Sequence, residues 1–281
     1  MSIRRAYAIA AGITWFGLGF GLILSAFNVY PPVDVPPGLF GVNPDGLAGL
    51  VGRVVDYMSA FTDLSNIIVA IVFTMLARNP DRGGRVWHAV RMDSLVMISI
   101  TGLIYAIVLA PDAQVEGLEV IGNTLKHMIV PVMTVALWLI VGPRRQVTFA
   151  SVFTAIVIPI TWGAYTLIRG HFIERYPYDF LNVVAYGLPA VLTNIAGVAA
   201  LGIVLGLVFW AIDRARIARE RSASTPAPDA HLSRDPAIHP SSTFATSTEA
   251  SALATAPARV GSLGLAAGIV PFVDIGVGHL G

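Results

Sequence analysis

Six apolar segments, each long enough to cross a lipid bilayer as a helix, limit what this chain can fold into more than any other feature. About 20 residues of helix span the hydrocarbon core of a membrane. The six segments are residues 6–27, 54–77, 93–110, 121–142, 149–168 and 189–212. Charged residues make up 12% of the chain, whereas a soluble domain carries about 25%. The sequence therefore predicts an all-α integral membrane protein with six transmembrane helices.

Arginine is distributed unevenly between the two sides of these predicted helices. Twelve arginines lie before the first segment and after the second, fourth and sixth: Arg4, Arg5, Arg78, Arg82, Arg85, Arg91, Arg144, Arg145, Arg214, Arg216, Arg219 and Arg221. The alternate loops hold Arg53, Arg169 and Arg175, and the third loop is acidic. Basic loops stay on the cytoplasmic side of a membrane. Both termini are therefore expected in the cytoplasm, an N-in/C-in orientation.

The composition changes after Arg221 to a segment rich in Ala, Ser, Thr and Pro. Such a segment lacks the apolar side chains needed to build a core, so we expect disorder to about Arg259. The residues from Gly261 onward are apolar, but they are too few and too rich in glycine to cross a membrane. The predicted organisation is a six-helix transmembrane domain, residues 1–216, followed by a disordered cytoplasmic tail, residues 217–281.

The first apolar segment follows Arg4 and Arg5, as the apolar part of a signal peptide would. We interpret it as a helix, because it runs to 22 residues without a convincing small-residue cleavage site and five more segments follow. Abundant arginine and alanine are typical of a GC-rich bacterial genome, so the expected location is the bacterial cytoplasmic membrane. The sequence contains no cysteine, which excludes disulfides and thiolate metal sites. The net charge of +1 gives no indication of a nucleic acid partner.

Polar residues interrupt the second apolar segment. Thr62, Asp63 and Asn66 lie in a run where hydroxyl, carboxylate and carboxamide groups are costly unless they face a protein interior or a wet cavity. On a helix with roughly 100° between residues, these side chains form one stripe together with Asp56 and Ser59. The second segment is therefore expected to face the centre of the helix bundle.

Polar residues of three other segments are expected at a similar depth. Asn123 and His127 share a face of the fourth segment, and Asn194 lies near the start of the sixth. Tyr165 and Arg169 share a face at the end of the fifth segment. His127 is the only histidine within the six predicted spans. With the orientation above, these groups gather near the outer leaflet and predict a common polar site.

This predicted site suits nucleophilic catalysis. A threonine hydroxyl becomes a nucleophile when a base takes its proton, and histidine is the usual base near neutral pH. Thr62 would be the nucleophile and His127 the base. The candidates for orienting the imidazole are Asp63, Asn66 and Asn123. The candidates for stabilising an oxyanion are Tyr165 and Arg169.

Neither a metal nor another cofactor is expected. A single histidine with no carboxylate three or four residues away on its helix makes a poor metal site. Haem ligation by two histidines would need a second buried histidine. The expected partners are membrane lipids or an amphiphilic ester whose tails stay in the bilayer, and the sequence does not indicate a protein partner.

Two other interpretations remain open. In the first, the polar stripe lines the path of a transporter or lipid-binding protein and Asp63 is its ion-coupled group, although no inverted repeat is visible. In the second, the protein is structural and its polar groups only tie helices together. Thr62 would then bond to the carbonyl four residues earlier, and Lys126 would extend its charge to the membrane surface. The aromatic residues that would form an interfacial belt are Trp162, Tyr165, Tyr176 and Tyr178.

Glycine and proline predict local features of the fold. Gly17 with Gly21, and Gly202 with Gly206, have the four-residue spacing at which membrane helices approach closely. The Pro- and Gly-rich loop of residues 28–52 is interpreted as a lid or as a plain linker.

Three short motifs occur in a fixed order along the predicted helices. They are residues 61–66 (FTDLSN), residues 123–127 (NTLKH) followed by Pro131, and residues 176–181 (YPYDFL). The motifs, their order and their spacing resemble the androgen-induced gene 1-like superfamily, whose bacterial members are described as Pr6Pr family membrane proteins. Trp162, Tyr165 and Arg169-Gly170 are also similar to the bacterial pattern. The resemblance covers residues 6–216.

Animal members of this superfamily are multi-pass hydrolases that cleave fatty acid esters of hydroxy fatty acids with an intramembrane threonine and histidine. The resemblance implies that Thr62 and His127 match these two residues and that the chain is a threonine hydrolase of fatty acyl esters. The chain departs from the animal pattern in two places. Pro131 follows His127 by four residues rather than five, and the pair Ser65-Asn66 looks like a bacterial feature. The bacterial branch can therefore keep the fold and a site while acting on another substrate.

Overall fold

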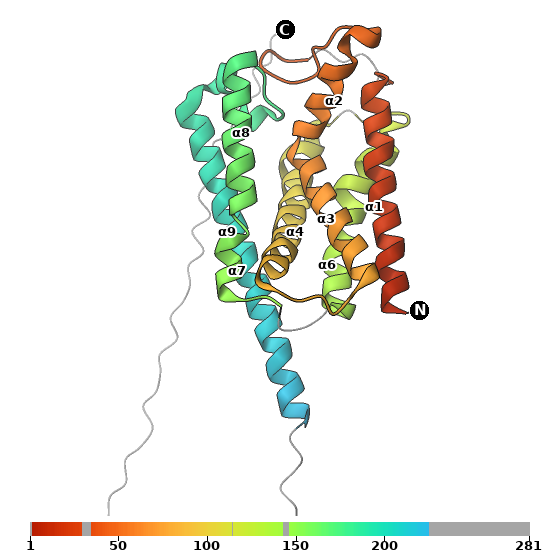
Figure 1. Ribbon diagram of the computed structural model, residues 1–281. Coiled ribbons are helices and arrows are strands. Elements are labelled where there is room, and N and C mark those ends of the chain that lie inside the picture. Colours follow the sequence, from red (N-terminus) through yellow and green to blue (C-terminus); the bar gives the residue numbers. More distant parts are fainter. Residues whose placement is uncertain (1, 30–34, 114, 143–145, 225–281) are drawn as a thin grey trace, which may run out of the picture. The chain divides into compact units, whose positions relative to one another are not determined.

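The structure, a computed structural model, describes residues 2–29, 35–113, 115–142 and 146–224 (Figure 1). In these residues the regular structure is helical, with one isolated β-bridge between Leu39 and Tyr176. Six helical spans are long and apolar enough to cross a membrane: Ile3–Ala26, Phe61–Arg78, Arg85–Leu109, Glu119–Val141, Phe149–Ile173 and Val183–Glu220. The prediction of six apolar helices of membrane-spanning length is therefore confirmed. The predicted tail lies outside the described residues from position 225 onward.

The helices form a bundle whose two ends differ. In chain order they are α1 (Ile3–Ala26), α2 (Leu50–Ser59), α3 (Phe61–Arg78), α4 (Arg85–Ile104), α5 (Glu119–Thr124), α6 (Val130–Val141), α7 (Phe149–Thr154), α8 (Val157–Ile173) and α9 (Val183–Ser224). The short 3₁₀ helices are η1 (Gly46–Gly49), η3 (Ala110–Asp112) and η5 (Asp179–Leu181), and the π-helical segments are η2 (Tyr105–Leu109) and η4 (Leu125–Ile129). The N-terminus and the turn between α3 and α4 lie at one end of the bundle, which we call the N-terminal end. The helix α2 and the connection between α8 and α9 lie at the other, the α2 end (Figure 1).

The second apolar segment forms two helices, and the prediction of a single helix there is wrong. Ala60 is extended, with φ −72° and ψ 139°, and separates α2 from α3. Two aromatic side chains bond to backbone groups at the break, which a continuous helix would have paired internally. Trp162 Nε1 donates to the carbonyl of Ser59 at 2.9 Å, and the N–H of Thr62 donates to the hydroxyl of Tyr178 at 3.1 Å. The predicted polar stripe is therefore divided between α2 and α3.

Three helices extend beyond their predicted limits. The helix α4 begins at Arg85 rather than at residue 93, and α8 continues to Ile173 rather than 168. The helix α9 begins at Val183, bends at Gly187 (φ 76°) and continues to Ser224. The extensions contain polar and charged residues. These residues continue the helices, but a search for apolar runs does not include them. As a result His88 and His171 also lie near the ends of spanning helices, and His127 is not the only histidine within a span.

The main core lies between α1, α3, α4 and α6. Its most deeply buried side chains include Tyr7, Val69, Val72, Phe73, Val96, Met97, Ile98 and Trp138. A Cβ atom on Gly17 would lie 3.2 Å from Leu125, and one on Gly206 would lie 2.9 Å from Val152. The close helix approaches predicted at the glycine pairs are thus confirmed, and they let η4 pack against α1 and α7 pack against α9.

The loop between α1 and α2 is anchored to the connection between α8 and α9. The N–H of Phe40 donates to the carbonyl of Tyr176 at 3.0 Å, and the N–H of Tyr176 donates to the carbonyl of Gly38 at 2.8 Å. The Asn182 side chain donates to the carbonyl of Pro37 at 2.8 Å. The described part of this loop is therefore more than a plain linker, because it fixes the residues that lead from α8 into α9.

Candidate active site

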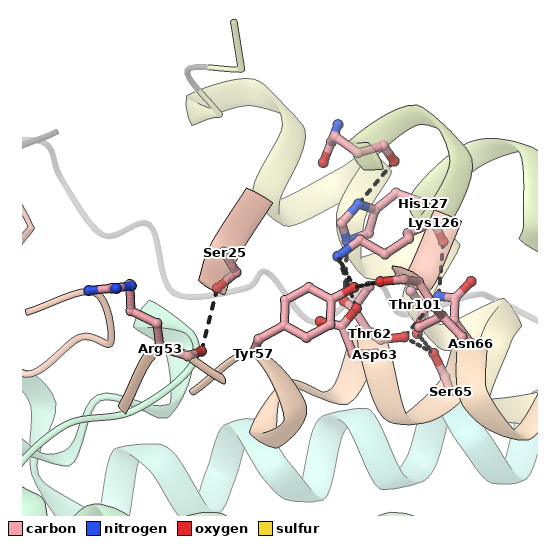
Figure 2. A network of polar contacts seen from close by, with 12 residues as sticks. Ser25, Arg53, Tyr57, Thr62, Asp63, Ser65, Asn66, Thr101, Lys126 and His127 are labelled. Carbon is pink, nitrogen blue, oxygen red and sulfur yellow. Dashed lines mark hydrogen bonds and ion pairs between the residues drawn. The ribbon is translucent and has the colours of Figure 1, made fainter. Parts of the chain in front are cut away.

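Thr62 and His127, the two residues predicted to carry catalysis, meet inside the helix bundle. Thr62 is the second residue of α3 and is 6% exposed. Its Oγ1 lies 3.1 Å from Nε2 of His127, which belongs to η4 (Figure 2). This is the separation expected of a nucleophile and its base.

The contacts of His127 define which ring nitrogen carries the proton. Nδ1 lies 3.3 Å from the backbone carbonyl oxygen of Asn123. A carbonyl oxygen only accepts, so in the neutral imidazole Nδ1 is the protonated nitrogen and Nε2 presents its lone pair to Thr62. Tyr105 stacks on the imidazole, with ring centroids 4.2 Å apart and 15° between the planes. Asn123 therefore orients the base through its backbone, while its side-chain amide donates to the Tyr105 hydroxyl.

A widened helical turn carries His127. Pro131 has no N–H to offer the carbonyl four residues earlier, and its ring crowds that carbonyl. The helix adapts in the π-helical segment η4, where the N–H of Val130 donates to the carbonyl of Leu125. Gly102 of α4 allows a close approach here, since a Cβ on it would lie 3.0 Å from the Pro131 side chain. Such π-helical turns are frequent at functional sites.

Tyr178 is the second polar partner of Thr62. Its hydroxyl oxygen lies 3.1 Å from Oγ1 of Thr62, in addition to accepting the Thr62 N–H. Burial raises the pKa of Tyr178 to about 12, so its hydroxyl is protonated at neutral pH. Since the Thr62 proton points to His127, the Tyr178 O–H is the donor in the contact with Oγ1. The Tyr178 hydroxyl is thus a donor beside the threonine oxygen, while the Thr62 N–H is bonded to the Tyr178 oxygen.

Two further polar residues of α3 brace the backbone of Thr62. Ser65 Oγ and Asn66 Nδ2 both donate to the Thr62 carbonyl, each at 2.8 Å. Asn66 also donates to the carbonyl of Lys126 at 3.3 Å, and Ser65 contacts the Thr101 hydroxyl at 2.8 Å (Figure 2). The predicted role of Asn66 beside the imidazole is therefore wrong, because its amide joins the backbones of α3 and η4.

Lys126 lies inside the bundle, and the prediction that it extends to the membrane surface is wrong. Its Nζ lies 2.9 Å from Oδ1 of Asp63, with side chains 13% and 4% exposed respectively. The ammonium also lies over the Tyr57 ring, 4.6 Å from its centroid. Asp63 is thus paired with a lysine rather than with His127, which supplies the partner that a buried carboxylate requires.

Tyr165 and Arg169, the predicted oxyanion groups, make their contacts on α2. The Tyr165 hydroxyl lies 2.8 Å from Ser59 Oγ, and Arg169 donates to Asp56 at 2.5 Å. Arg169 also lies 4.5 Å from the centroid of the Phe40 ring. These contacts hold α8 against α2 and the α1–α2 loop, and none of them is with the Thr62 hydroxyl.

An apolar pocket of about 90 Å³ lies beside Thr62. Its walls come from α3, α4, η2, α8, α9 and the connections that lead into α8 and α9, and they include Val96, Ile100, Ile104, Ile160, Ile195 and Val198. None of the residues lining this pocket is charged, and its hydroxyl groups belong to Thr62, Thr101 and Tyr178. The site therefore combines a reactive polar end with a hydrocarbon-like interior. Among the described residues, no group of three or more His, Asp or Glu side chains is placed to hold a metal ion.

Two residues have other roles at this site than the sequence predicts. An aromatic belt is the sequence-based expectation for Tyr178, although its place in the YPYDFL motif is a signal for a site role. The membrane surface is the expectation for Lys126, although a charged residue next to the proposed base in an apolar segment is a signal for a buried partner. In both cases the contacting residue belongs to α3, far away in the sequence.

Comparison with models of protein families, with curated proteins and with solved structures finds no match. The resemblance to androgen-induced gene 1-like proteins therefore stays a prediction.

Proposed function

We propose that this protein is an intramembrane threonine hydrolase of lipid-like fatty acyl esters, with Thr62 as nucleophile and His127 as base. The observation that carries the proposal is the 3.1 Å contact between Oγ1 of Thr62 and Nε2 of His127. The contact lies at the edge of a pocket without charged residues. Position and tautomer both suit removal of the threonine proton.

The reaction runs in two halves. Nε2 of His127 takes the proton of Oγ1 as this oxygen attacks the ester carbonyl carbon. The bond from that carbon to the alcohol oxygen breaks, the alcohol leaves with the proton, and the acyl group stays on Thr62. Water, deprotonated by His127, then releases the fatty acid and restores the hydroxyl. The Tyr178 O–H is the donor for the oxyanion in both halves.

The apolar pocket supports an acyl substrate. Burial of a hydrocarbon chain against its aliphatic walls is favourable, at about 0.8 kcal/mol for each methylene group. A charged headgroup would find no opposite charge among the lining residues. The alternative of an ion-coupled transporter has less support, because Asp63, its central group, is already paired with Lys126.

The proposed location is the outer-leaflet side of a bacterial cytoplasmic membrane. Arg4, Arg5, Arg78, Arg82 and Arg85 belong to the N-terminal end of the bundle, and Thr62 lies in the first turn of α3, at the α2 end. The positive-inside rule then assigns the N-terminal end to the cytoplasm. A fluorescent protein fused after residue 224 should fluoresce in bacterial cells, and a periplasmic reporter active at the same position would contradict this orientation.

Labelling with a fluorophosphonate probe tests the proposed activity. The purified protein in detergent micelles should react with the probe, and Thr62→Ala should abolish the reaction. Thr134→Ala is the matched control, because Thr134 is also a buried threonine of a membrane helix but bonds its hydroxyl to the Val130 carbonyl four residues earlier. Equal labelling of wild type and Thr62→Ala would refute the proposal.

A further inference from the structure

We infer that Lys126 is a positioning residue. Its buried ion pair with Asp63 holds the Thr62 hydroxyl at hydrogen-bond distance from the His127 imidazole. The inference depends on the proposed hydrolase function. It adds Lys126 to the residues needed for full activity, although Lys126 takes no part in the proton transfer between the hydroxyl and the imidazole. Lys126 contacts neither the reacting atoms nor the pocket, so it acts through the relative placement of two helices.

The Asp63–Lys126 ion pair and the Thr62–His127 contact are neighbouring contacts between α3 and η4. Asp63 follows Thr62 along the chain, and Lys126 precedes His127. The two contacts measure 2.9 Å and 3.1 Å. The hydrogen bond from Asn66 to the Lys126 carbonyl at 3.3 Å is a third contact between the same two elements (Figure 2). A shift of α3 along η4 by one residue would break all three contacts together.

The choice of a lysine at this position is unusual for the chain. Lys126 is its only lysine, and the other basic residues are arginines. A buried ion pair adds little net stability compared with an apolar pair of similar size, because desolvation of the two charges offsets their attraction. Stability alone therefore does not explain the pair. An ion pair fixes the distance and direction between two helices, whereas a contact between two methyl groups does not.

The surroundings of the ammonium are shaped to hold it in one place. Nζ of Lys126 lies 3.5 Å from the Tyr57 hydroxyl, which in turn donates to the Leu18 carbonyl at 2.9 Å. A Cβ on Gly21 of α1 would lie 2.8 Å from that hydroxyl and 3.3 Å from Nζ. Gly21 therefore leaves the space in which Lys126 reaches Asp63. A methyl group there would disturb the ion pair without removing any charge.

The test compares kcat with KM for p-nitrophenyl octanoate, with the full-length protein in micelles. The variants are Lys126→Met, which removes the charge, and Gly21→Ala, which crowds it. Gly19→Ala is the control, because it adds a methyl group to the same helix with nothing within 4 Å. A misplacement of about 1 Å costs roughly 100-fold in rate. Both test variants should therefore lose kcat on that scale and keep the KM of the wild type, since neither residue lines the pocket.

A second measurement separates positioning from general damage to the fold. Because Lys126 is the only lysine, ¹⁵N-lysine labelling gives a single side-chain ammonium NMR signal, which Asp63→Asn and Gly21→Ala should shift. If Lys126→Met does not fold, Gly21→Ala decides the question. A wild-type kcat in folded Lys126→Met or Gly21→Ala, with hydrolysis still abolished by Thr62→Ala, would overturn the inference alone. Hydrolysis that survives Thr62→Ala would overturn the proposed function, and the inference with it.

Discussion

The hydroxyl oxygen of Tyr178 lies 3.1 Å from the backbone nitrogen of Thr62 and 3.1 Å from its Oγ1. One phenol thus bonds to the first turn of α3 and contacts the proposed nucleophile. Tyr178 belongs to the connection between α8 and α9, which the α1–α2 loop holds in place through Tyr176. The chemistry proposed at Thr62 therefore depends on loops at the α2 end of the bundle as well as on the helices.

Removing the Tyr178 hydroxyl should slow hydrolysis without weakening substrate binding. Tyr178→Phe deletes the proposed oxyanion donor, and loss of one such donor typically costs about 100- to 1,000-fold in kcat. It should leave KM near the wild-type value, because the aromatic ring that lines the pocket remains. The measurement is steady-state hydrolysis of p-nitrophenyl octanoate. Tyr186→Phe is the control, because its hydroxyl donates to Asp179 away from Thr62, and equal kcat values for the two variants would contradict the role of Tyr178.

A methyl group on Gly170 should destabilise the protein and lower its activity. A Cβ at this position would lie 2.1 Å from the Tyr176 ring, so Gly170→Ala must displace Tyr176 and the residues that follow it. Overpacking of this kind costs about 1–3 kcal/mol. Thermal unfolding in micelles measures the effect. The control is Gly197→Ala, where a Cβ meets nothing within 4 Å, and a Gly170→Ala protein as stable as this control would show that the packing is not as described.

Burial of Tyr178 predicts a specific loss of stability at alkaline pH. Its pKa is raised to about 12 in the folded protein, from about 10 in an unfolded chain. Between these values the folded state holds a proton that the unfolded state has released, so the free energy of unfolding falls as the pH rises through this window. Thermal unfolding curves taken on either side of about pH 10 should show a smaller loss for Tyr178→Phe than for the wild type. Equal losses would mean that Tyr178 is not buried.

Arg53 should be essential for order in the loop between α1 and α2. Arg53 is 8% exposed, and its guanidinium donates to the carbonyls of Ala26, Pro44 and Gly46. Each hydrogen bond from a charged donor contributes about 1.5–3 kcal/mol. Arg53→Met should therefore speed hydrogen exchange and proteolysis in residues 35–49. Arg175→Met is the comparison, because Arg175 makes one exposed bond to the Val42 carbonyl; similar exchange in both variants would contradict the assignment.

The number and apolar character of the spanning helices could be predicted because they depend on local sequence. Apolar runs of spanning length gave six helices, and Thr62 and His127 stood out as reactive groups within such runs. The break at Ala60 could not be predicted, because the apolar run continues through it. It is stabilised by Trp162 and Tyr178, which come from distant parts of the chain.

The hydrogen-bond and ion-pair partners of the polar residues also could not be predicted from the local sequence. The orientation of His127 depends on the π-helical turn ahead of Pro131, which adjusts the direction of each side chain in η4. Lys126 was expected to extend outward because its partner, Asp63, lies on another helix. A helical projection shows which residues share a face, but it does not show which residue of the neighbouring helix they meet.

The identity of the residue that reacts is the most direct test of the proposed hydrolase. Wild-type protein is treated with a fluorophosphonate probe and digested, and the modified peptide is sequenced by mass spectrometry. The adduct is predicted on Oγ1 of Thr62, and it should be absent from His127→Gln, which lacks the base but keeps a polar side chain of similar size. An adduct on another residue, or an adduct on Thr62 that forms equally well in His127→Gln, would contradict the central claim.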